Sequence, residues 1–239
     1  MRKKAMVTGA SRGIGEAIAA VLAARGYDLM LTCRVQAAGL DRICSRLHEE
    51  YGVKCEGFCG DISDESFVDE VFEGTEVCDV LINNAGISYV GLLQDMSLDM
   101  WNRVVGVNLT SAFLTCRRAI PLMLRQGEGR IINISSMWGR CGASMEVAYS
   151  ASKGGLNIFT MALAKELAPS NIAVNALACG VVDTKMNEFL SPREKEALCD
   201  EIPAGRFATV KEVALAVSSL LDAPLYMTGQ VIGFDGGFI

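Results

Sequence analysis

Tyr149 and Lys153 are the two residues whose types and spacing point most directly to chemistry. They lie four positions apart, so on a helix their side chains share one face. A free phenol has a pKa of about 10, and a nearby positive charge favours its ionised form. We therefore expect the ammonium of Lys153 to lower the pKa of Tyr149 towards neutral pH, where a phenol can exchange protons with a substrate.

Two further polar segments are candidates for the same site. Residues 83–86 read Asn-Asn-Ala-Gly and residues 135–136 read Ser-Ser, and each segment follows a short apolar run. Taken separately, these features also fit structural roles. Asn-Ala-Gly is a common turn, Ser136 fits a helix cap, Tyr149 fits a core position, and Lys153 can extend its charge to the surface.

A glycine-rich turn at residues 8–15, Thr-Gly-Ala-Ser-Arg-Gly-Ile-Gly, is a candidate phosphate site. It follows a short apolar strand and precedes an amphipathic helix, whose free N–H groups and dipole favour a pyrophosphate. Gly9, Gly13 and Gly15 give the spacing G-x-x-x-G-x-G, which differs from the general G-x-G-x-x-G fingerprint. The alternative is a strand-to-helix connection that binds no ligand.

Arginines near the second strand favour one dinucleotide over another. An acidic residue at the end of that strand would bind the ribose 2′-hydroxyl of NAD, but here Arg34 follows Cys33. Arg12 within the glycine turn supplies a second cation, and two guanidinium groups suit a phosphate monoester. We therefore expect NADP(H), the alternative being that either arginine is only a solvated surface charge.

The elements that must position these residues alternate between short apolar runs and longer amphipathic ones. Helices are expected at 13–25, 38–51, from 63 onward, 98–125, 148–168 and 210–221. Strands are expected at 4–7, 29–33, 53–58, 77–82, 130–134, 172–177 and 231–234.

This alternation predicts an α/β fold: a doubly wound parallel sheet of about seven strands with helices on both faces, a Rossmann fold. Residues 1–239 show no linker or internal repeat and are expected to form a single domain. The least regular segment, 180–206, follows a strand and contains Pro192, Pro203 and Gly205. We expect it to act as a lid over a substrate.

Composition excludes several other classes of protein. The 239 residues are 51% hydrophobic and carry a net charge of −6, which argues against disorder and nonspecific nucleic-acid binding. No apolar run approaches the roughly 20 residues of a membrane span, and the basic start is followed by no signal-peptide core.

Nine scattered cysteines without such a signal favour a reduced, cytoplasmic protein. A single histidine, His48, makes a zinc site or a serine hydrolase improbable, so no metal is expected.

Taken together, these motifs resemble the short-chain dehydrogenase/reductase family along essentially the whole chain. The set comprises the glycine turn, residues 83–86, Asn108, and Ser136 thirteen positions before the Tyr149-x-x-x-Lys153 pair. Within that family the sequence is most similar to bacterial 3-oxoacyl-[acyl-carrier-protein] reductases, as judged from residues 8–15, 107–111, 149–153 and 228–237.

The resemblance implies four catalytic residues. Tyr149 would protonate the carbonyl oxygen during reduction, and Lys153 would lower the pKa of Tyr149 and hold the nicotinamide ribose. Ser136 would donate a hydrogen bond to the same oxygen, where negative charge develops. Asn108 would hold a water that relays protons to Lys153.

The resemblance also implies a cofactor site for NADP(H). Asp61 and Ile62 would meet the adenine, residues 84–86 would flank its ribose, and Gly180, Val182 and Thr184 would meet the nicotinamide end. The cofactor-binding residues expected are therefore Gly9, Ser11, Arg12, Gly13, Ile14, Gly15, Arg34, Asp61, Ile62, Asn84, Ala85, Gly86, Tyr149, Lys153, Gly180, Val182 and Thr184.

One departure and several alternatives remain at this point. The family usually has Pro-Gly after the sixth strand, whereas this chain has Cys179-Gly180, which frees the backbone and could bring a thiol near the cofactor. The expected substrate is a small or carrier-bound 3-oxoacyl thioester of fatty acid biosynthesis, with Arg125, Arg130 and Arg140 as candidates for meeting the acidic carrier. The alternatives are a sugar, steroid or other small ketone, or a non-catalytic dinucleotide-binding regulator. Family members are commonly homotetramers, so the resemblance implies a homotetramer. This chain is expected to bind neither nucleic acid nor membrane.

Overall fold

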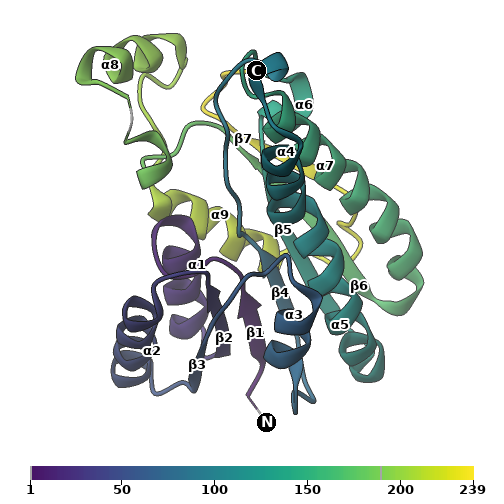
Figure 1. Cartoon of the computed structure of the whole chain (residues 1–239). Coiled ribbons are helices and arrows are strands. Elements are labelled where there is room, and N and C mark those ends of the chain that lie inside the picture. Colours follow the sequence, from purple (N-terminus) through teal and green to yellow (C-terminus); the bar gives the residue numbers. More distant parts are fainter. Residues whose placement is uncertain (1, 189) are drawn as a thin grey trace.

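One parallel sheet of seven strands runs through the computed structural model, which describes residues 2–188 and 190–239. The strands lie in the order β3-β2-β1-β4-β5-β6-β7, and every neighbouring pair is parallel. The predicted doubly wound sheet is therefore confirmed (Figure 1). The strands are β1 (Lys4–Val7), β2 (Asp28–Cys33), β3 (Cys55–Cys59), β4 (Val80–Asn83), β5 (Gly129–Ser136), β6 (Ile172–Cys179) and β7 (Val231–Phe234).

Helices cover both faces of the sheet (Figure 1). One face packs against α1, α2 and α9, and the other against α3, α5 and α7. The helices are α1 (Gly13–Ala24), α2 (Ala37–Tyr51), α3 (Glu65–Phe72), α4 (Leu98–Val105), α5 (Ser111–Gln126), α6 (Trp138–Cys141), α7 (Val147–Leu167), α8 (Pro192–Glu201) and α9 (Val210–Asp222). Short 3₁₀ turns are η1 (Leu93–Asp95), η3 (Ala168–Ser170) and η4 (Lys185–Asn187).

Continuous apolar sequence in the strands follows from burial on both faces. In β1, Ala5 and Val7 enter the core beneath α1 and α2, whereas Met6 between them enters the opposite core. In β5, Ile132 enters the core beneath α1 and α2, and Ile131 enters the opposite core. Because successive side chains of a strand point to opposite faces, a strand covered on both faces needs apolar residues at every position.

The predicted helix over 98–125 contains an interruption that periodicity did not reveal. The chain forms α4, then a π-helical segment η2 (Gly106–Thr110), and then α5. A π segment adds one residue to a helical turn and rotates the side chains that follow it. Asn108 lies within this segment and is 2% exposed, so the irregular turn presents its amide to the interior.

The direction of chain winding reverses between β1 and β4. From β1 the chain continues outward to β2 and β3, and then returns to place β4 on the other side of β1. At such a switch point the connecting loops diverge, which opens a crevice at the carboxyl ends of the strands. The glycine turn follows β1 and residues 83–86 end β4, so both motifs lie at this crevice.

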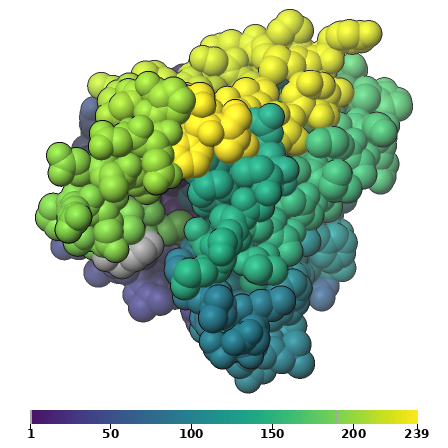
Figure 2. All heavy atoms as spheres, turned by 90° about the horizontal axis from the view of Figure 1, so that it is seen from above, coloured from purple at the N-terminus to yellow at the C-terminus, as the bar shows by residue number. Residues whose placement is uncertain are grey.

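The segment after β6 stands away from the body of the molecule. Figure 1 shows α8 outside the helical layers, and Figure 2 shows a hollow between this segment and the chain that follows β5. The segment is tied back where Val182 pairs with Ala208 and where Arg206 makes a two-pronged ion pair with Glu212. Among the described residues, no helix is long and apolar enough to cross a bilayer.

Gly15 and Gly39 offer a test of how closely the glycine turn is packed, because each is the third residue of its helix. A Cβ at Gly15 would lie 2.4 Å from the carbonyl oxygen of Gly9, whereas a Cβ at Gly39 would meet only the Gln36 side chain at 3.5 Å. We expect Gly15→Ala to lower the free energy of unfolding by roughly 1–3 kcal/mol through this clash. The matched Gly39→Ala should leave it unchanged or raise it by up to about 1 kcal/mol. Urea unfolding of both variants measures the difference, and equal effects would contradict the close packing.

Candidate active site

The glycine turn is held against the end of β4 by hydrogen bonds. The hydroxyl of Thr8 accepts from the backbone N–H groups of Asn84 and Ala85, each at 2.9 Å. The Asn84 amide donates to the carbonyls of Thr8 and Gly9 at 2.9 and 3.1 Å. A Cβ at Gly9 would lie 3.0 Å from the Cα of Ala85, and the φ of Gly9 is +66°. Glycine is therefore needed here both for space and for conformation.

The start of α1 fits a pyrophosphate. Arg12 is the residue before the helix and has an extended backbone, and no side chain caps the helix start among the described residues. The first backbone N–H groups of α1 therefore remain available for an anionic ligand, and the positive end of the helix dipole favours such a ligand. The Cβ space at Gly9 and Gly15 is filled by backbone, so only glycine lets the turn stay this close to the helix. The residues present thus fit a dinucleotide.

Arg12 and Arg34 are both exposed near this turn. The Arg34 guanidinium reaches back towards the end of β3, where its Nε lies 3.7 Å from Oδ2 of Asp61. Ser11 and Ile14 lie in the same turn, and Ile14 packs on the core beneath α1. Two exposed guanidinium groups therefore follow β1 and β2, at the carboxyl ends of these strands.

Asp61 is engaged by more partners than the sequence indicated. Its carboxylate accepts from the hydroxyl of Ser63 at 2.6 Å and from the guanidinium of Arg103, which comes from α4. Burial raises the pKa of Asp61, but the hydrogen bonds from Ser63 and Arg103 outweigh it and lower the pKa. Ile62 is 7% exposed and its side chain belongs to the core with Phe67, so its side chain is not open to a ligand.

Ser136, Tyr149 and Lys153 come together at the carboxyl end of β5. Ser136 is the last residue of that strand, and the other two lie on α7, which packs beside it. The Nζ of Lys153 lies 5.8 Å from the centre of the Tyr149 ring and donates to the carbonyl of Ile134 at 2.7 Å. The structure therefore brings the three side chains together, and Tyr149 and Lys153 share one face of α7.

The expected effect of Lys153 on Tyr149 is not found in this arrangement. Burial raises the pKa of Tyr149, and a hydrogen bond with the hydroxyl of Ser136 only partly opposes that rise. Burial also lowers the pKa of Lys153 to about 8. The prediction that the lysine lowers the tyrosine pKa is therefore wrong, because desolvation dominates the pKa of Tyr149 and the ammonium is directed at the carbonyl of Ile134.

Asn108 is fixed by three hydrogen bonds. Its Oδ1 accepts from the N–H of Ile87 at 2.8 Å, and its Nδ2 donates to the carbonyl of Ile87 and to the hydroxyl of Ser152, both at 2.9 Å. A Cβ at Gly86 would lie 3.5 Å from both the Asn108 Oδ1 and the Lys153 Nζ. Asn108, Gly86 and Lys153 thus converge, but both amide hydrogens are used, so a water can only bind as a donor to the side chain.

The start of the segment after β6 closes the far side of the site. A Cβ at Gly180 would lie 2.7 Å from the Cα of Asp235, and a Cβ at Gly13 would lie 3.8 Å from the Thr184 methyl group. Val182 is 5% exposed, and Asn187 donates to its carbonyl at 2.8 Å. The structure therefore brings Thr184 across from the glycine turn.

Three residues of the site were missed by the sequence analysis. Ser152 accepts from Asn108 and donates to the carbonyl of Tyr149 at 2.7 Å. Asn157, one turn beyond Lys153, donates to the carbonyl of Gly139 at 3.0 Å and accepts from Ser135 at 2.6 Å. Arg103 was missed because it reaches Asp61 from a different helix. A polar residue on the buried face of α7 was the available signal for Ser152 and Asn157.

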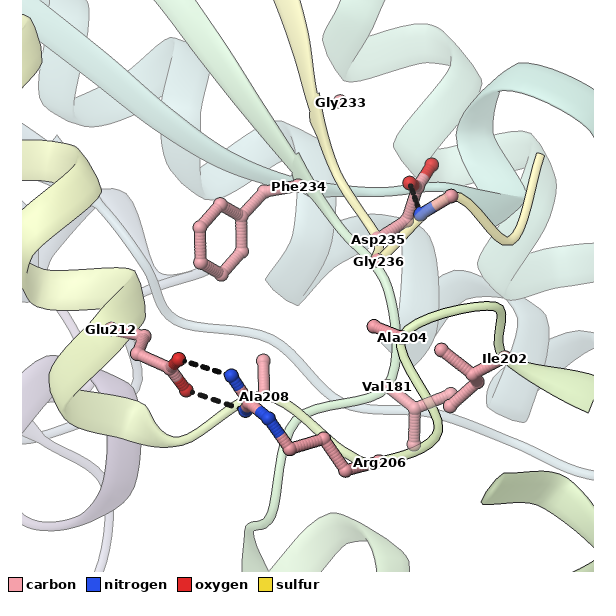
Figure 3. Close-up of a pocket in the computed structure, with 11 residues that line it drawn as sticks. Val181, Ile202, Ala204, Arg206, Ala208, Glu212, Gly233, Phe234, Asp235 and Gly236 are labelled. Atoms are coloured by element: carbon pink, nitrogen blue, oxygen red, sulfur yellow. Dashed lines mark hydrogen bonds and ion pairs between the residues drawn. The ribbon is translucent and has the colours of Figure 1, made fainter. Parts of the chain in front are cut away.

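A separate cavity of about 400 Å³ lies between β7 and the loop that leads into α9 (Figure 3). Arg206 and Glu212 face each other across one side of it, and Phe234 lines another. Neither Tyr149 nor Lys153 lines this cavity, so its position does not mark the catalytic groups. Within the described residues, no cluster of three or more histidine, cysteine or acidic side chains could hold a metal ion.

The arrangement supports proton transfer coupled to a bound dinucleotide. A partly buried phenol, a serine hydroxyl and a buried ammonium lie at the same strand ends as an uncapped helix start and a close-packed glycine turn. Such a site can place an oxygen-bearing substrate between an acid and a cofactor.

Comparison with known proteins agrees with this geometry. Residues 3–195 match the sequence profile described as short chain dehydrogenase. The chain is 40% identical over its whole length to the uncharacterized oxidoreductase YmfI of Bacillus subtilis, covering 99% of that protein. It is 40% identical to the 3-oxoacyl-[acyl-carrier-protein] reductase FabG of Aquifex aeolicus, with 98% of this chain and 96% of that protein covered.

Solved structures show the same fold. A candidate gluconate dehydrogenase from Agrobacterium tumefaciens superposes with a TM-score of 0.91 at 30% identity, covering 99% of this chain and 95% of that one. A candidate NAD(P)-dependent gluconate 5-dehydrogenase from Beutenbergia cavernae, solved with NADP bound at low occupancy, gives a TM-score of 0.90 at 35% identity and covers 99% and 96% of the two chains. With its profile match, full-length relatives and parallel sheet, the chain belongs to the short-chain dehydrogenase/reductase family and is an oxidoreductase of that family.

Proposed function

We propose that this protein uses NADP(H) to reduce a carbonyl to a secondary alcohol, with a 3-oxoacyl thioester on acyl carrier protein as substrate. The observation that carries the proposal is the convergence of Ser136, Tyr149 and Lys153 beside the dinucleotide crevice. In a substrate complex, the carbonyl oxygen would lie between the hydroxyls of Ser136 and Tyr149.

The protonation states suit reduction. A tyrosine whose pKa is raised by burial stays protonated at neutral pH and can donate its proton to the developing alkoxide. Ser136 donates a second hydrogen bond to the same oxygen and stabilises its charge. Lys153, with a pKa of about 8, is mainly protonated at pH 7 and would bind the ribose hydroxyls next to the reacting ring. A bound nicotinamide cofactor supplies the hydride.

The cofactor would lie along the carboxyl ends of β1, β4 and β5. The turn at 8–15 would hold its pyrophosphate, Arg12 and Arg34 its 2′-phosphate, and Asp61 with the Ile62 backbone its adenine. The backbone at 84–86 would flank the adenine ribose, and Gly180, Val182 and Thr184 would meet the nicotinamide. The NADP bound to the Beutenbergia cavernae protein supports this choice of cofactor. Within this single domain, residues 180–206 would act as the lid over the substrate.

Similarity to the reductases of several bacteria supports a 3-oxoacyl substrate. Those of Aquifex aeolicus and Escherichia coli are 40% and 35% identical to this chain. The structural similarity to gluconate dehydrogenases favours a sugar acid as the second candidate. Among the arginines proposed to meet an acidic carrier, Arg130 donates to the carbonyl of Ala223 at 2.7 Å and is only partly exposed. Arg125 and Arg140 are exposed and remain the better candidates.

Several exposed apolar side chains support the proposed homotetramer. Phe113 on α5 and Ile158 on α7 are 45% and 64% exposed. Large apolar side chains on helix faces commonly mark an interface with another copy. Sedimentation velocity would show a species of four chains, and a monomer at micromolar concentration would contradict this proposal.

A substrate panel with NADPH tests the proposed function directly. An acetoacetyl thioester, a cyclic ketone and a keto-sugar acid are supplied in turn, and NADPH oxidation is followed by absorbance. We expect the thioester to be reduced fastest. A preference for the sugar acid would favour the second candidate, and NADPH binding with no reduction of any carbonyl would indicate a non-catalytic regulator.

Removing the phenolic hydroxyl tests the acid. We expect Tyr149→Phe to lower kcat by at least roughly 10²-fold, because the alkoxide then lacks its proton donor. Affinity for NADPH, measured by fluorescence titration, should change by less than about threefold. Tyr226→Phe is the control, since Tyr226 is 99% exposed. Unchanged turnover in Tyr149→Phe would remove this residue from the mechanism.

Reversing one charge tests the preference for NADP(H). We expect Arg34→Asp to weaken NADPH binding by at least about tenfold while NADH binding changes little, because only NADPH carries the 2′-phosphate. Arg42→Asp makes the same charge change at an exposed position of α2 and should preserve the ratio. An unchanged NADPH-to-NADH affinity ratio in Arg34→Asp would refute the assignment.

Burial of the Lys153 charge should lower the free energy of unfolding of the protein. The pKa of Lys153 is lowered by burial from 10.5 to about 8, which corresponds to roughly 3 kcal/mol against the charged form. We expect Lys153→Met to raise the free energy of unfolding at pH 7 by about 1–3 kcal/mol while abolishing turnover. The gain should shrink as pH rises from 8 to 10.5, where the lysine of the unfolded wild-type chain also loses its proton.

Lys165→Met is the matched control for that experiment, because Lys165 lies on the same helix but is exposed. Its unfolding free energy should stay within about 0.5 kcal/mol of the wild type. Destabilisation of Lys153→Met at pH 7 would show that the hydrogen bond to Ile134 outweighs the burial of the charge.

A further inference from the structure

Two pairs of thiols lie on the face of the sheet that α2 covers. Cys33 on β2 and Cys59 on β3 form one pair, and Cys44 on α2 and Cys55 on β3 form the other. The thiols of each pair interact: the Cys55 thiol lowers the pKa of Cys44, and the Cys59 thiol adds to the burial that raises the pKa of Cys33. Four of the nine cysteines are therefore paired without being bonded.

The geometry of the first pair suits a disulfide. Cys33 and Cys59 are register partners on adjacent parallel strands, so their side chains point to the same face. Neighbouring strands lie about 4.8 Å apart, which falls within the range of roughly 4.4–6.8 Å between the Cα atoms of bonded cysteines. Cys59 is exposed and Cys33 is buried. An oxidant in solution can therefore reach the Cys59 thiol first, and the Cys33 thiol is shielded from it.

The first pair also adjoins the adenosine end of the cofactor site. Cys33 directly precedes Arg34, and Cys59 lies two residues before Asp61. The Cys59 thiol donates to the carbonyl of Arg34 at 3.5 Å, and the N–H of Gly60 donates to the carbonyl of Cys33 at 2.9 Å. A change at these sulfurs therefore acts directly on the backbone that carries Arg34.

We propose that Cys33 and Cys59 form an oxidisable dithiol whose conversion to a disulfide weakens NADPH binding, an inference that rests on the proposed cofactor function. The oxidant is a peroxide. The Cys59 thiol loses its proton, and the thiolate attacks one peroxide oxygen to give a sulfenic acid and hydroxide, which takes up that proton and leaves as water. The Cys33 sulfur then attacks the Cys59 sulfur, the S–S bond forms as the S–O bond breaks, and the leaving hydroxide takes the Cys33 proton as a second water. Two electrons pass from the two thiols to the peroxide.

The effect on the cofactor follows from the bonds that change. Oxidation removes the S–H group that donates to the Arg34 carbonyl and brings the two sulfurs to about 2.05 Å. The two side chains must then turn towards each other, and the backbone at Arg34 loses the contact that the Cys59 thiol made with it. This change displaces the Arg34 guanidinium from a 2′-phosphate. NADPH binding should weaken by about tenfold, whereas NADH, which lacks that phosphate, should bind within about threefold of its original affinity.

The experiment uses the full-length protein treated with hydrogen peroxide, followed by blocking of remaining thiols and mass spectrometry of peptides. The expected product links the peptides of Cys33 and Cys59, and a thiol reductant restores both the free thiols and NADPH affinity. Cys59→Ser should abolish the linked peptide and keep NADPH affinity after peroxide treatment. The Cys44→Ser/Cys55→Ser double variant removes the second pair beneath the same helix and should respond like the wild type.

The outcomes of this experiment test separately whether the disulfide forms, whether it acts through Arg34, and whether the protein binds a dinucleotide. Absence of the linked peptide would overturn the dithiol. A linked peptide with unchanged NADPH affinity, or with equal loss of NADH affinity, would overturn its action through Arg34. If the reduced protein binds neither dinucleotide, the proposed function fails, and the peptide map still decides whether the pair is oxidised.

Discussion

The buried ammonium group of Lys153 constrains the structure at the carboxyl end of β5 more than any apolar contact does. Lys153 is 4% exposed, and its charge is stabilised by the carbonyl of Ile134 at the end of β5. Such a charge is tolerated only where every nearby polar group is placed to receive it. The carboxyl end of β5 must therefore stay in register with α7, and much of the buried polar structure serves that requirement.

Buried hydrogen bonds tie the helices of one face to the sheet. Asn83 on β4 donates to Asn133 on β5 at 2.9 Å, and Asn133 donates in turn to Thr160 on α7 at 2.8 Å. Thr115 on α5 donates to Asn83 at 2.7 Å. Apolar packing alone would let a helix slide along the sheet by a fraction of a turn, whereas a polar pair without its partner is costly when buried. These bonds thus fix where Tyr149 and Lys153 stand relative to Ser136.

Burial explains why the acid–base pair differs from the simplest electrostatic expectation. In water, an ammonium one helical turn away favours a phenolate, but here both groups are desolvated and each is driven towards its neutral form. The site therefore holds a neutral phenol beside an ammonium that is ready to lose its proton. This is a suitable resting state for an acid that protonates an alkoxide during reduction.

Much of the fold could be predicted because its signals are local. Apolar runs, amphipathic periods and the glycine turn predicted about seven strands and their parallel arrangement, whereas the crevice between β1 and β4 follows from the strand order of the structure. The limits of β1 and β7 agree with the prediction, and the other strand limits shifted by at most three residues, as for β4, expected at 77–82 and found at Val80–Asn83. The π-helical segment around Asn108 was not predicted, because its amphipathic period differs little from that of an ordinary helix.

The types and order of the site residues were determined by the sequence alone, since a tyrosine and a lysine four apart on a helix must share a face. Only the tertiary structure decided their surroundings. It set the hydrogen bonds of Asn108 with Ile87 and Ser152, the ion pair of Arg103 with Asp61, and the register that pairs Cys33 with Cys59. These contacts join residues far apart in the chain. Their geometry, and the desolvation that accompanies it, arises only when the sheet and its two layers of helices have packed together.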